Sequence, residues 1–373
     1  MSKHPDSPTR PGTRGVWGIA IQILGFGIGI ALLGWAVRVA MREENRAQLS
    51  KLTEATAGEI LLLLSLAALS VGINGMGFWV VLNPVRRIRA TDVISTNAVA
   101  TFLAYLPFKL SIVSRFVIHN RRDKIPVLMI GAWIAAAGIL IVAVLTPMML
   151  MSIWLKRIDL LWWTGSLVLI CACTLMGTAL ARQLSGDVGI ARLARVGVGE
   201  RVTGTDAFRR VHTGLEMLSN PRATLIANAL RVLDLLAFAL RFYIAARVLD
   251  LPISFQDAML LGTSYFVIGA ASPTGMLGTR EAGTIGIAEL VGISPTALSE
   301  TASGQIPIAA TVLFVTAVEA VVNLGCAGFG IAWLKARKPL DPDGEPAGAE
   351  LIARSVDGVE GDDGEAERPG AYD

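Results

Sequence analysis

The segment from Ser272 to Gly283 combines residue types that suit the binding of an anion. It reads Ser-Pro-Thr-Gly-Met-Leu-Gly-Thr-Arg-Glu-Ala-Gly and follows an apolar stretch. Pro273 ends a helix, and Gly275 and Gly278 permit a tight reversal of the chain. The pattern therefore predicts a broken helix with a new helix starting just after the glycines.

The two charged residues of this segment would stand at the start of the returning helix. A helix N-terminus presents free N–H groups and a partial positive charge, which suit an anion such as phosphate. Arg280 adds a fork of donors that matches the same group. Glu281 either caps that N-terminus or pairs with an intramembrane arginine. A purely structural turn is the alternative interpretation.

Charged residues also interrupt the apolar stretch 222–249. Asn228, Arg231, Asp234 and Arg241 fall within about 140° of one another on a helix, so they share one face. In apolar surroundings such residues need partners or water, and this face must look inward or into a wet cavity. Arg231 and Asp234 can pair at i,i+3. A structural ion pair and a ligand-facing site both remain open.

Three further charges lie in or beside apolar stretches. Glu319 stands in the last one, with Asn323 one turn on, and either accepts protons or pairs with an arginine. Lys109 and Arg115 follow Leu-Pro-Phe at another break, where Lys109 either contributes to a site or only reaches toward the interface. Asp234, Glu281 and Glu319 are the candidates for coupling to ions or protons.

Composition places these charges in a membrane protein. The 373 residues are 53% hydrophobic and 17% charged, below the quarter that is typical of soluble domains. Crossing a bilayer takes about 20 apolar residues. Six stretches are long enough: 16–39, 59–82, 125–147, 158–181, 222–249 and 306–334.

Two further apolar stretches are too short to cross and break at a proline. Residues 93–106 continue as a second arm at about 110–118, and residues 257–271 continue at 282–292. Each first arm reaches only about 20 Å. The fold class predicted is an all-α integral membrane protein with six spanning helices and two opposed re-entrant helical hairpins.

Loop charges favour this topology, because Lys and Arg concentrate on the cytoplasmic side. With both hairpins re-entrant and both termini cytoplasmic, 20 basic residues lie inside and seven outside. If both segments cross, the split is about even, or the arginine-rich 182–222 loop lies outside. Two broken helices entering from opposite faces are typical of transporters, where irregular backbone lines a cavity. We expect a multi-pass protein of the bacterial inner membrane.

The remaining segments are polar. Residues 1–15 form a cytoplasmic tail, 16–334 the membrane domain and 183–221 a basic cytoplasmic linker; residues 339–373 form an acidic tail predicted to be disordered. In the linker, Phe208, Val211, Leu215 and Leu218 recur at helical spacing. Residues 205–219 therefore form either a helix on an anionic lipid surface or a helix packed on the bundle.

The broken segments resemble a known family. Leu277, Gly278, Arg280 and Glu281 match the Pro-Gly-Gly-Leu-Gly-x-Arg-Glu motif of the flippase-like membrane region of bacterial lysylphosphatidylglycerol synthetases, although Thr274 and Met276 depart from it. The stretch 105–110, followed by an arginine, is similar to the family's Leu-Pro-Gly-Arg/Lys-Leu-Gly segment. The resemblance covers about residues 16–334.

This resemblance implies movement of lipids or lipid-linked molecules between membrane leaflets. It suggests a stand-alone member without the aminoacyl-transferring domain, hence no enzyme. The substrate path would then run past a set of residues on the hairpins and on 222–249: Arg280, Glu281, Gly278, Gly275, Arg231, Asp234, Arg241, Arg115 and Lys109.

Other functions remain open at this stage. The chain contains no phosphate-binding loop for ATP and no convincing catalytic or metal constellation around its three histidines, so we expect no cofactor, no metal and no nucleic-acid partner. The main alternative to lipid transport is a non-transporting membrane partner of an envelope-lipid biosynthesis complex.

Overall fold

The computed structural model describes residues 13–41, 50–106, 109–155, 157–196, 205–272, 275–291, 293 and 308–338. Within these residues every regular element is helical, with twelve α-helices and one short 3-10 helix, η1 (Lys51–Thr53). The predicted all-α class is confirmed. The predicted acidic tail 339–373 and most of the tail 1–15 lie outside the described residues.

Long helices coincide with the six predicted spans. Five are long and apolar enough to cross a membrane: α3 (Ala57–Leu82), α6 (Val127–Leu155), α7 (Leu160–Leu184), α11 (Pro221–Val248) and α14 (Ile308–Ala336). The sixth, α1 (Thr13–Ala40), has 28 residues, but only its part Gly27–Arg38 is found as a shorter apolar helix. Multiple crossings are thus supported, whereas a total of six stays a prediction.

The outward faces of these helices are apolar. On α7, Leu160 is 79% exposed, Met176 71% and Val168 66%. Side chains of this kind along a whole helix face would be unfavourable in water and are suited to lipid chains. In the described residues, the polar and charged side chains within the long helices are mostly buried instead, which is the reverse of the pattern in a soluble protein.

Two pairs of short helices replace the predicted broken segments. The first pair is α4 (Ala90–Leu103) and α5 (Leu110–Arg121), and the second is α12 (Phe255–Ala271) and α13 (Thr279–Val291). The second arm of the first pair ends at Arg121, three residues later than predicted. The second arm of the second pair begins at Thr279, three residues earlier than predicted. The prolines of both breaks, Pro107 and Pro273, lie outside the described residues.

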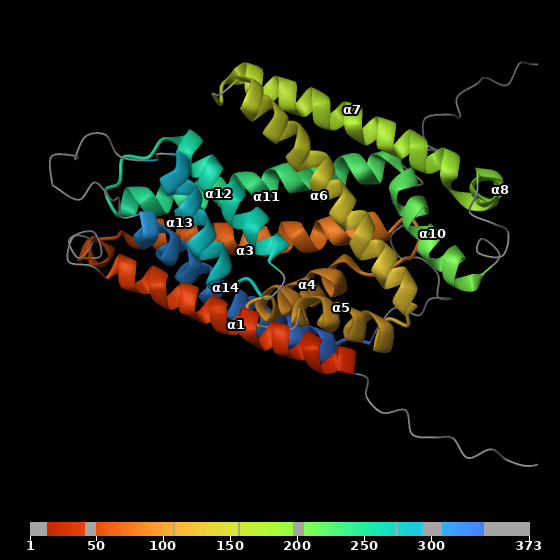
Figure 1. The fold of residues 1–373 in the computed structure, drawn as a ribbon, viewed down its shortest axis with the longest axis horizontal. Helices are drawn as coiled ribbons and strands as arrows, with labels where there is room; N and C mark the ends of the chain where they lie inside the picture. Colours follow the sequence, from red (N-terminus) through yellow and green to blue (C-terminus); the bar gives the residue numbers. More distant parts are fainter. Residues whose placement is uncertain are drawn as a thin grey trace, which may run out of the picture. The chain divides into compact units, whose positions relative to one another are not determined.

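The two pairs enter the bundle from opposite ends (Figure 1). Arg89, just before α4, donates to the carbonyl of Lys338, and Arg122, just after α5, donates to that of Arg337. Both ends of the first pair therefore lie beside the C-terminal end of α14. At the other end, Lys51 pairs with Asp250, close to the start of α12. Return of each pair within the bilayer stays a prediction, but their opposed arrangement is consistent with it.

The tips of the two pairs meet. The backbone N–H of Met276 donates to the carbonyl of Ala104 at 3.0 Å. The ammonium group of Lys109 donates to the carbonyl of Ser272, where α12 ends. Gly275 has a φ of +129° and lies so close to the first tip that an added Cβ would be 3.2 Å from the carbonyl oxygen of Leu106. Backbone therefore contacts backbone where the two breaks face each other.

The linker contains two helices, α8 (Gly186–Val196) and α10 (Asp206–Ser219). α10 packs against α6 and α7, with Met217 fully buried and the Nε2 atom of His212 2.6 Å from the carbonyl oxygen of Leu184. Of the two interpretations, the structure favours a helix packed on the bundle; contact with anionic lipid stays a prediction. Val211, expected on the packed face, is 53% exposed.

The turn before α13 rests on the backbone of α1. Gly278 has a φ of +81°, and a Cβ added to it would lie 1.6 Å from the carbonyl oxygen of Gly29. A side chain is therefore excluded both by the conformation and by the space. Two glycines far apart in the sequence allow this close approach of two backbones.

We expect Gly278→Ala to lower the free energy of unfolding by at least about 1 kcal/mol, because α1 and the turn must move apart and the left-handed backbone is strained. Thermal unfolding of the purified protein in detergent measures the change. Gly286→Ala on α13 is the matched control, since no atom lies within 4 Å of its added Cβ. Equal melting temperatures for the two variants would contradict the prediction.

Candidate functional site

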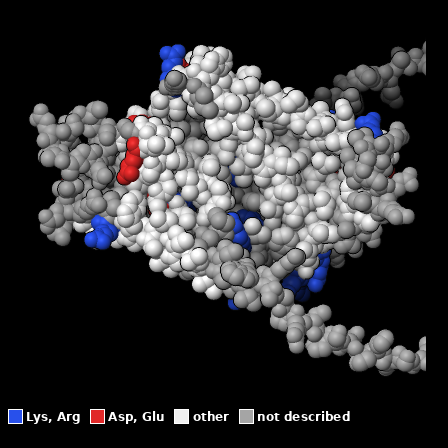
Figure 2. Space-filling model, in the orientation of Figure 1, with Lys and Arg blue, Asp and Glu red and all other residues white. Residues whose placement is uncertain are grey.

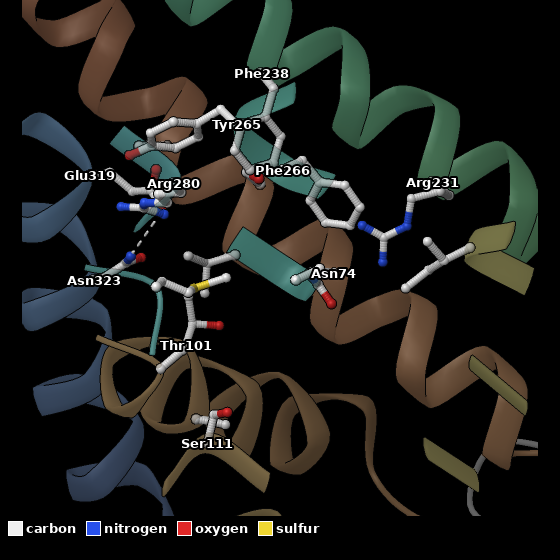
Figure 3. A pocket seen from close by; sticks show the side chains of 18 of the residues that line it. Asn74, Thr101, Ser111, Arg231, Phe238, Tyr265, Phe266, Arg280, Glu319 and Asn323 are labelled. Carbon is white, nitrogen blue, oxygen red and sulfur yellow. Dashed lines mark hydrogen bonds and ion pairs between the residues drawn. The ribbon is translucent and has the colours of Figure 1, made fainter. Parts of the chain in front are cut away.

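A cavity of about 210 Å³ lies between the long helices and the two broken pairs. Four arginines line it: Arg115, Arg231, Arg241 and Arg280. Figure 2 shows Lys and Arg side chains at the bottom of a hollow in a face that is otherwise almost uncharged. In Figure 3, Arg280, Glu319 and Asn323 gather on one side of the cavity and Arg231 lies on the other. The sequence separates these residues widely, and the fold brings them to one place.

Arg280 is almost completely occupied by protein partners. Its side chain is 2% exposed, donates from Nε to Glu281 at 2.9 Å and from Nη1 to Glu319 at 3.0 Å, and donates from Nη2 to the hydroxyl of Tyr105 at 3.2 Å. Its guanidinium carbon also lies 4.1 Å from the centre of the Tyr265 ring. A buried arginine with two carboxylates and stacked rings is fully compensated.

Glu281 has both of the roles that the sequence left open. Its Oε2 accepts from the backbone N–H of Gly278 at 2.6 Å, which caps the start of α13. Its Oε1 accepts from Arg280 and from the hydroxyl of Thr316. The N–H of Gly278, one of those predicted to meet an external anion, is therefore already bound by the protein.

Arg231 and Asp234 form the predicted i,i+3 pair, with Nη1 and Oδ2 2.7 Å apart. Asp234 is completely buried and also accepts from the hydroxyl of Ser70 on α3. The guanidinium carbon of Arg231 lies 4.8 Å from the centre of the Phe266 ring. Asp234 does not line the cavity but holds Arg231 at its edge. The fourth residue of the predicted face, Asn228, bonds instead to Thr174 on α7.

Arg241 and Arg115 carry the donors that lack partners. Arg241 is 1% exposed and uses only Nη1, which lies 3.3 Å from Glu319, so its Nε and Nη2 have no partner among the described residues. Arg115 bonds through Nη2 to Asn97, and its buried Nη1 has no described partner either. Both guanidinium groups stack on phenylalanine rings, Phe238 and Phe78.

Two amide side chains add acceptors to the same cavity. The Oδ1 atoms of Asn74 and Asn323 are buried and have no partner among the described residues, and both side chains line the cavity. Asn323 donates to the hydroxyl of Tyr105 at 3.1 Å. The site thus offers charged donors and neutral acceptors together, which suits an anionic group that carries its own hydroxyl or amine.

A second cavity, of about 170 Å³, lies between the hairpin tips. It is lined by Lys109, Ser272 and Gly275, and it shares Ala104, Ser111, Ala270 and Met276 with the first cavity. Of the predicted residues, the four arginines therefore line the first cavity and Lys109 and Gly275 the second, whereas Asp234 and Glu281 line neither. Gly278 lines neither, because it packs on α1.

Sequence reasoning missed the supporting residues. Asn74 was a visible signal, since it is a polar residue inside the apolar stretch 59–82. Tyr105, Tyr265 and the stacked phenylalanines carried no signal of their own, because aromatic residues are ordinary in membrane helices. In the part of the chain that the structure describes, no cluster of His, Cys, Asp or Glu could hold a metal ion.

One comparison with known proteins identifies a family. Residues 22–302 match the family described as the lysylphosphatidylglycerol synthase TM region. The chain belongs to this family. The resemblance found in the sequence is confirmed, and the family associates the chain with membrane lipids. The match ends before α14, so Glu319 and Asn323 lie outside it. No curated protein and no solved structure matches the chain.

We expect Arg280→Ala to destabilise the protein by about 3–5 kcal/mol, because two buried carboxylates lose the cation they share. The loss is measured as a lower melting temperature and a lower yield of folded protein. Arg247→Ala is the control, since Arg247 lies on the exposed side of α11 and its removal should change stability by no more than about 0.5 kcal/mol. An Arg280→Ala protein as stable as the control would show that the charge network contributes little.

Proposed function

We propose that this protein moves a lipid with an anionic headgroup between the two leaflets of its membrane, and that the headgroup passes through the arginine-lined cavity. The observation that carries the proposal is the set of buried guanidinium nitrogens without described partners on Arg115 and Arg241.

These donors favour an anionic ligand. A buried polar group without a partner costs about 1–3 kcal/mol, and more when it is charged. A phosphate oxyanion offers several acceptors to the forked guanidinium group and neutralises charge at the same time. Among the described residues, Arg115 forms no ion pair, whereas each of the other three arginines contacts a carboxylate. The cavity therefore carries one positive charge more than its surroundings balance.

The surroundings of the cavity favour a lipid over a soluble anion. Helices with exposed apolar faces, such as α6 and α7, make up much of the described surface, so the molecules around the cavity are lipids. The second cavity adjoins the first and is lined mainly by apolar side chains. A headgroup in the first cavity would leave room for the adjoining part of the lipid between the hairpin tips.

The contact between the hairpin tips supports a gated passage. Ser111 of the first hairpin and Ala270 and Met276 of the second border both cavities. Each hairpin enters from its own end of the bundle, so parting of the tips would join the two ends through the cavities. Opposed broken helices around a central substrate site are typical of transporters.

We expect Arg115→Gln to reduce movement of a fluorescent phosphatidylglycerol by about tenfold or more, because the cavity loses a positive charge that no described carboxylate balances. The measurement uses the full chain in reconstituted vesicles and follows loss of fluorescence when a membrane-impermeant quencher is added. Arg87→Gln is the control, since Arg87 lies exposed in the loop before α4. The proposal fails if wild type moves no lipid, or if both variants match it; a wild type without transport would favour the non-transporting partner.

A disulfide across the tips tests the gate separately. Ala104→Cys and Met276→Cys place two thiols where the backbones are joined by a hydrogen bond of 3.0 Å, and a disulfide needs such a close approach of two backbones. We expect oxidation to stop transport and a reductant to restore it. The single Ala104→Cys variant, treated identically, controls for the native cysteines on α7 and α14. Undiminished transport by the cross-linked protein would exclude parting of the tips.

A further inference from the structure

Glu319 is shared by two arginines of the cavity. Its Oε1 lies 3.0 Å from Arg280 Nη1, and its Oε2 lies 3.3 Å from Arg241 Nη1. The side chain is 9% exposed and lines the cavity. Figure 3 shows it beside Arg280 and Asn323 at one wall. Unlike the hairpin residues, it stands on α14, beyond the residues that match the family.

The two arginines depend on Glu319 unequally. Arg280 would keep Glu281, the hydroxyl of Tyr105 and the Tyr265 ring if Glu319 moved away. Arg241 would lose its only described carboxylate and keep only the Phe238 ring. Its bond to Glu319 is also longer than the 2.7–2.9 Å or so of a strong charge-assisted hydrogen bond.

The unused donors of Arg241 lie on the same guanidinium group. Nε and Nη2 are both buried and without described partners, so an oxyanion that bonds to them must lie next to the carboxylate of Glu319. An oxyanion on these donors and Glu319 compete for the single charge of Arg241. Because the bond from Glu319 to Arg241 is longer than its bond to Arg280, an anion that binds Arg241 weakens the bond to Arg241 first.

We infer that Glu319 occupies the position on Arg241 where the anion of the ligand binds. A phosphate oxyanion replaces Glu319 on Arg241, while Glu319 stays paired with Arg280. This inference rests on the proposed function, whose ligand it specifies as a singly charged phosphate ester. Around the cavity, Arg115, Arg231, Arg241 and Arg280 face three carboxylates, Asp234, Glu281 and Glu319. One added negative charge brings this set, which leaves out Lys109 of the adjoining cavity, to neutrality. Glu319 thereby sets the affinity and the charge preference of the site.

The test measures binding to the full chain in detergent, with dioctanoyl phosphatidylglycerol as the probe. We expect Glu319→Gln to bind it about tenfold more tightly than wild type, because the competing carboxylate is gone. Dioctanoylglycerol, which lacks the phosphate, should show no change. Glycerophosphoglycerol, which has the phosphodiester but no acyl chains, shows which part of the lipid the site recognises. If Glu319→Gln binds it more tightly to the same degree, the site recognises the headgroup alone. If binding tightens only for the lipid, the site also needs the chains. Both results support the inference.

The double variant Arg241→Gln/Glu319→Gln assigns the effect to Arg241. We expect it to lose the gain, because the freed guanidinium is absent. Glu289→Gln, an exposed acid on α13, is the matched control for removal of one negative charge. Unchanged or weaker binding by a folded Glu319→Gln protein overturns the inference, as does a gain that persists in the double variant or equals that of Glu289→Gln.

A second substitution keeps the test decisive if Glu319→Gln does not fold. Glu319→Asp retains the charge but shortens the side chain, so it cannot reach both arginines; we expect tighter binding in the same direction, and binding no tighter than wild type overturns the inference. Failure of the proposed function can be distinguished from failure of this inference, because transport in vesicles can be absent while Glu319→Gln still tightens binding. Conversely, transport with unaltered binding in these variants refutes only the role of Glu319.

Discussion

A charge inside an apolar bundle must be compensated, and the guanidinium group of Arg280 is where this structure meets that constraint most fully. Its partners come from the second hairpin, from α14 and from the turn after α4, and its stacked ring comes from α12. The second hairpin and α14, which hold the two carboxylates, cannot shift far from each other without leaving a buried charge unpaired. The network therefore fixes the second hairpin against the long helices around it.

Elsewhere in the site, charge compensation by the protein is incomplete. Asp234 and Glu281 each belong to a local pair, with Arg231 and Arg280 respectively. Arg115 has only an amide and an aromatic ring beside it. Helix packing alone would be served equally well by an uncharged residue at this position. A positive charge without a carboxylate partner beside a cavity is understandable if a reversibly bound ligand supplies the negative charge.

The sequence predicts much of the fold because apolar length and Pro/Gly breaks are local signals. The long helices and the four short arms follow from them, as do the Arg231–Asp234 pair and the shared face that brings Arg241 inward. The site was less predictable. Arg280 and Glu319 are 39 positions apart, and Arg280 and Tyr105 are 175 apart, so no spacing reveals that Arg280 is occupied. The sequence predicts the packed side of α10 only in part, for a related reason. The burial of His212 and Met217 depends on the surfaces of α6 and α7.

The contact of Gly29 with Gly278 has a consequence for how the chain assembles. α1 is synthesised before the other described helices, and its main contacts in the described structure are with α13 and α14. During insertion it must therefore stay in the bilayer without these partners until α13 and α14 have been made. Its stretch from Val16 to Val37 is uncharged, so it can rest in lipid alone during that interval. The backbone of Gly29 that later contacts the turn is thus in place before the turn exists.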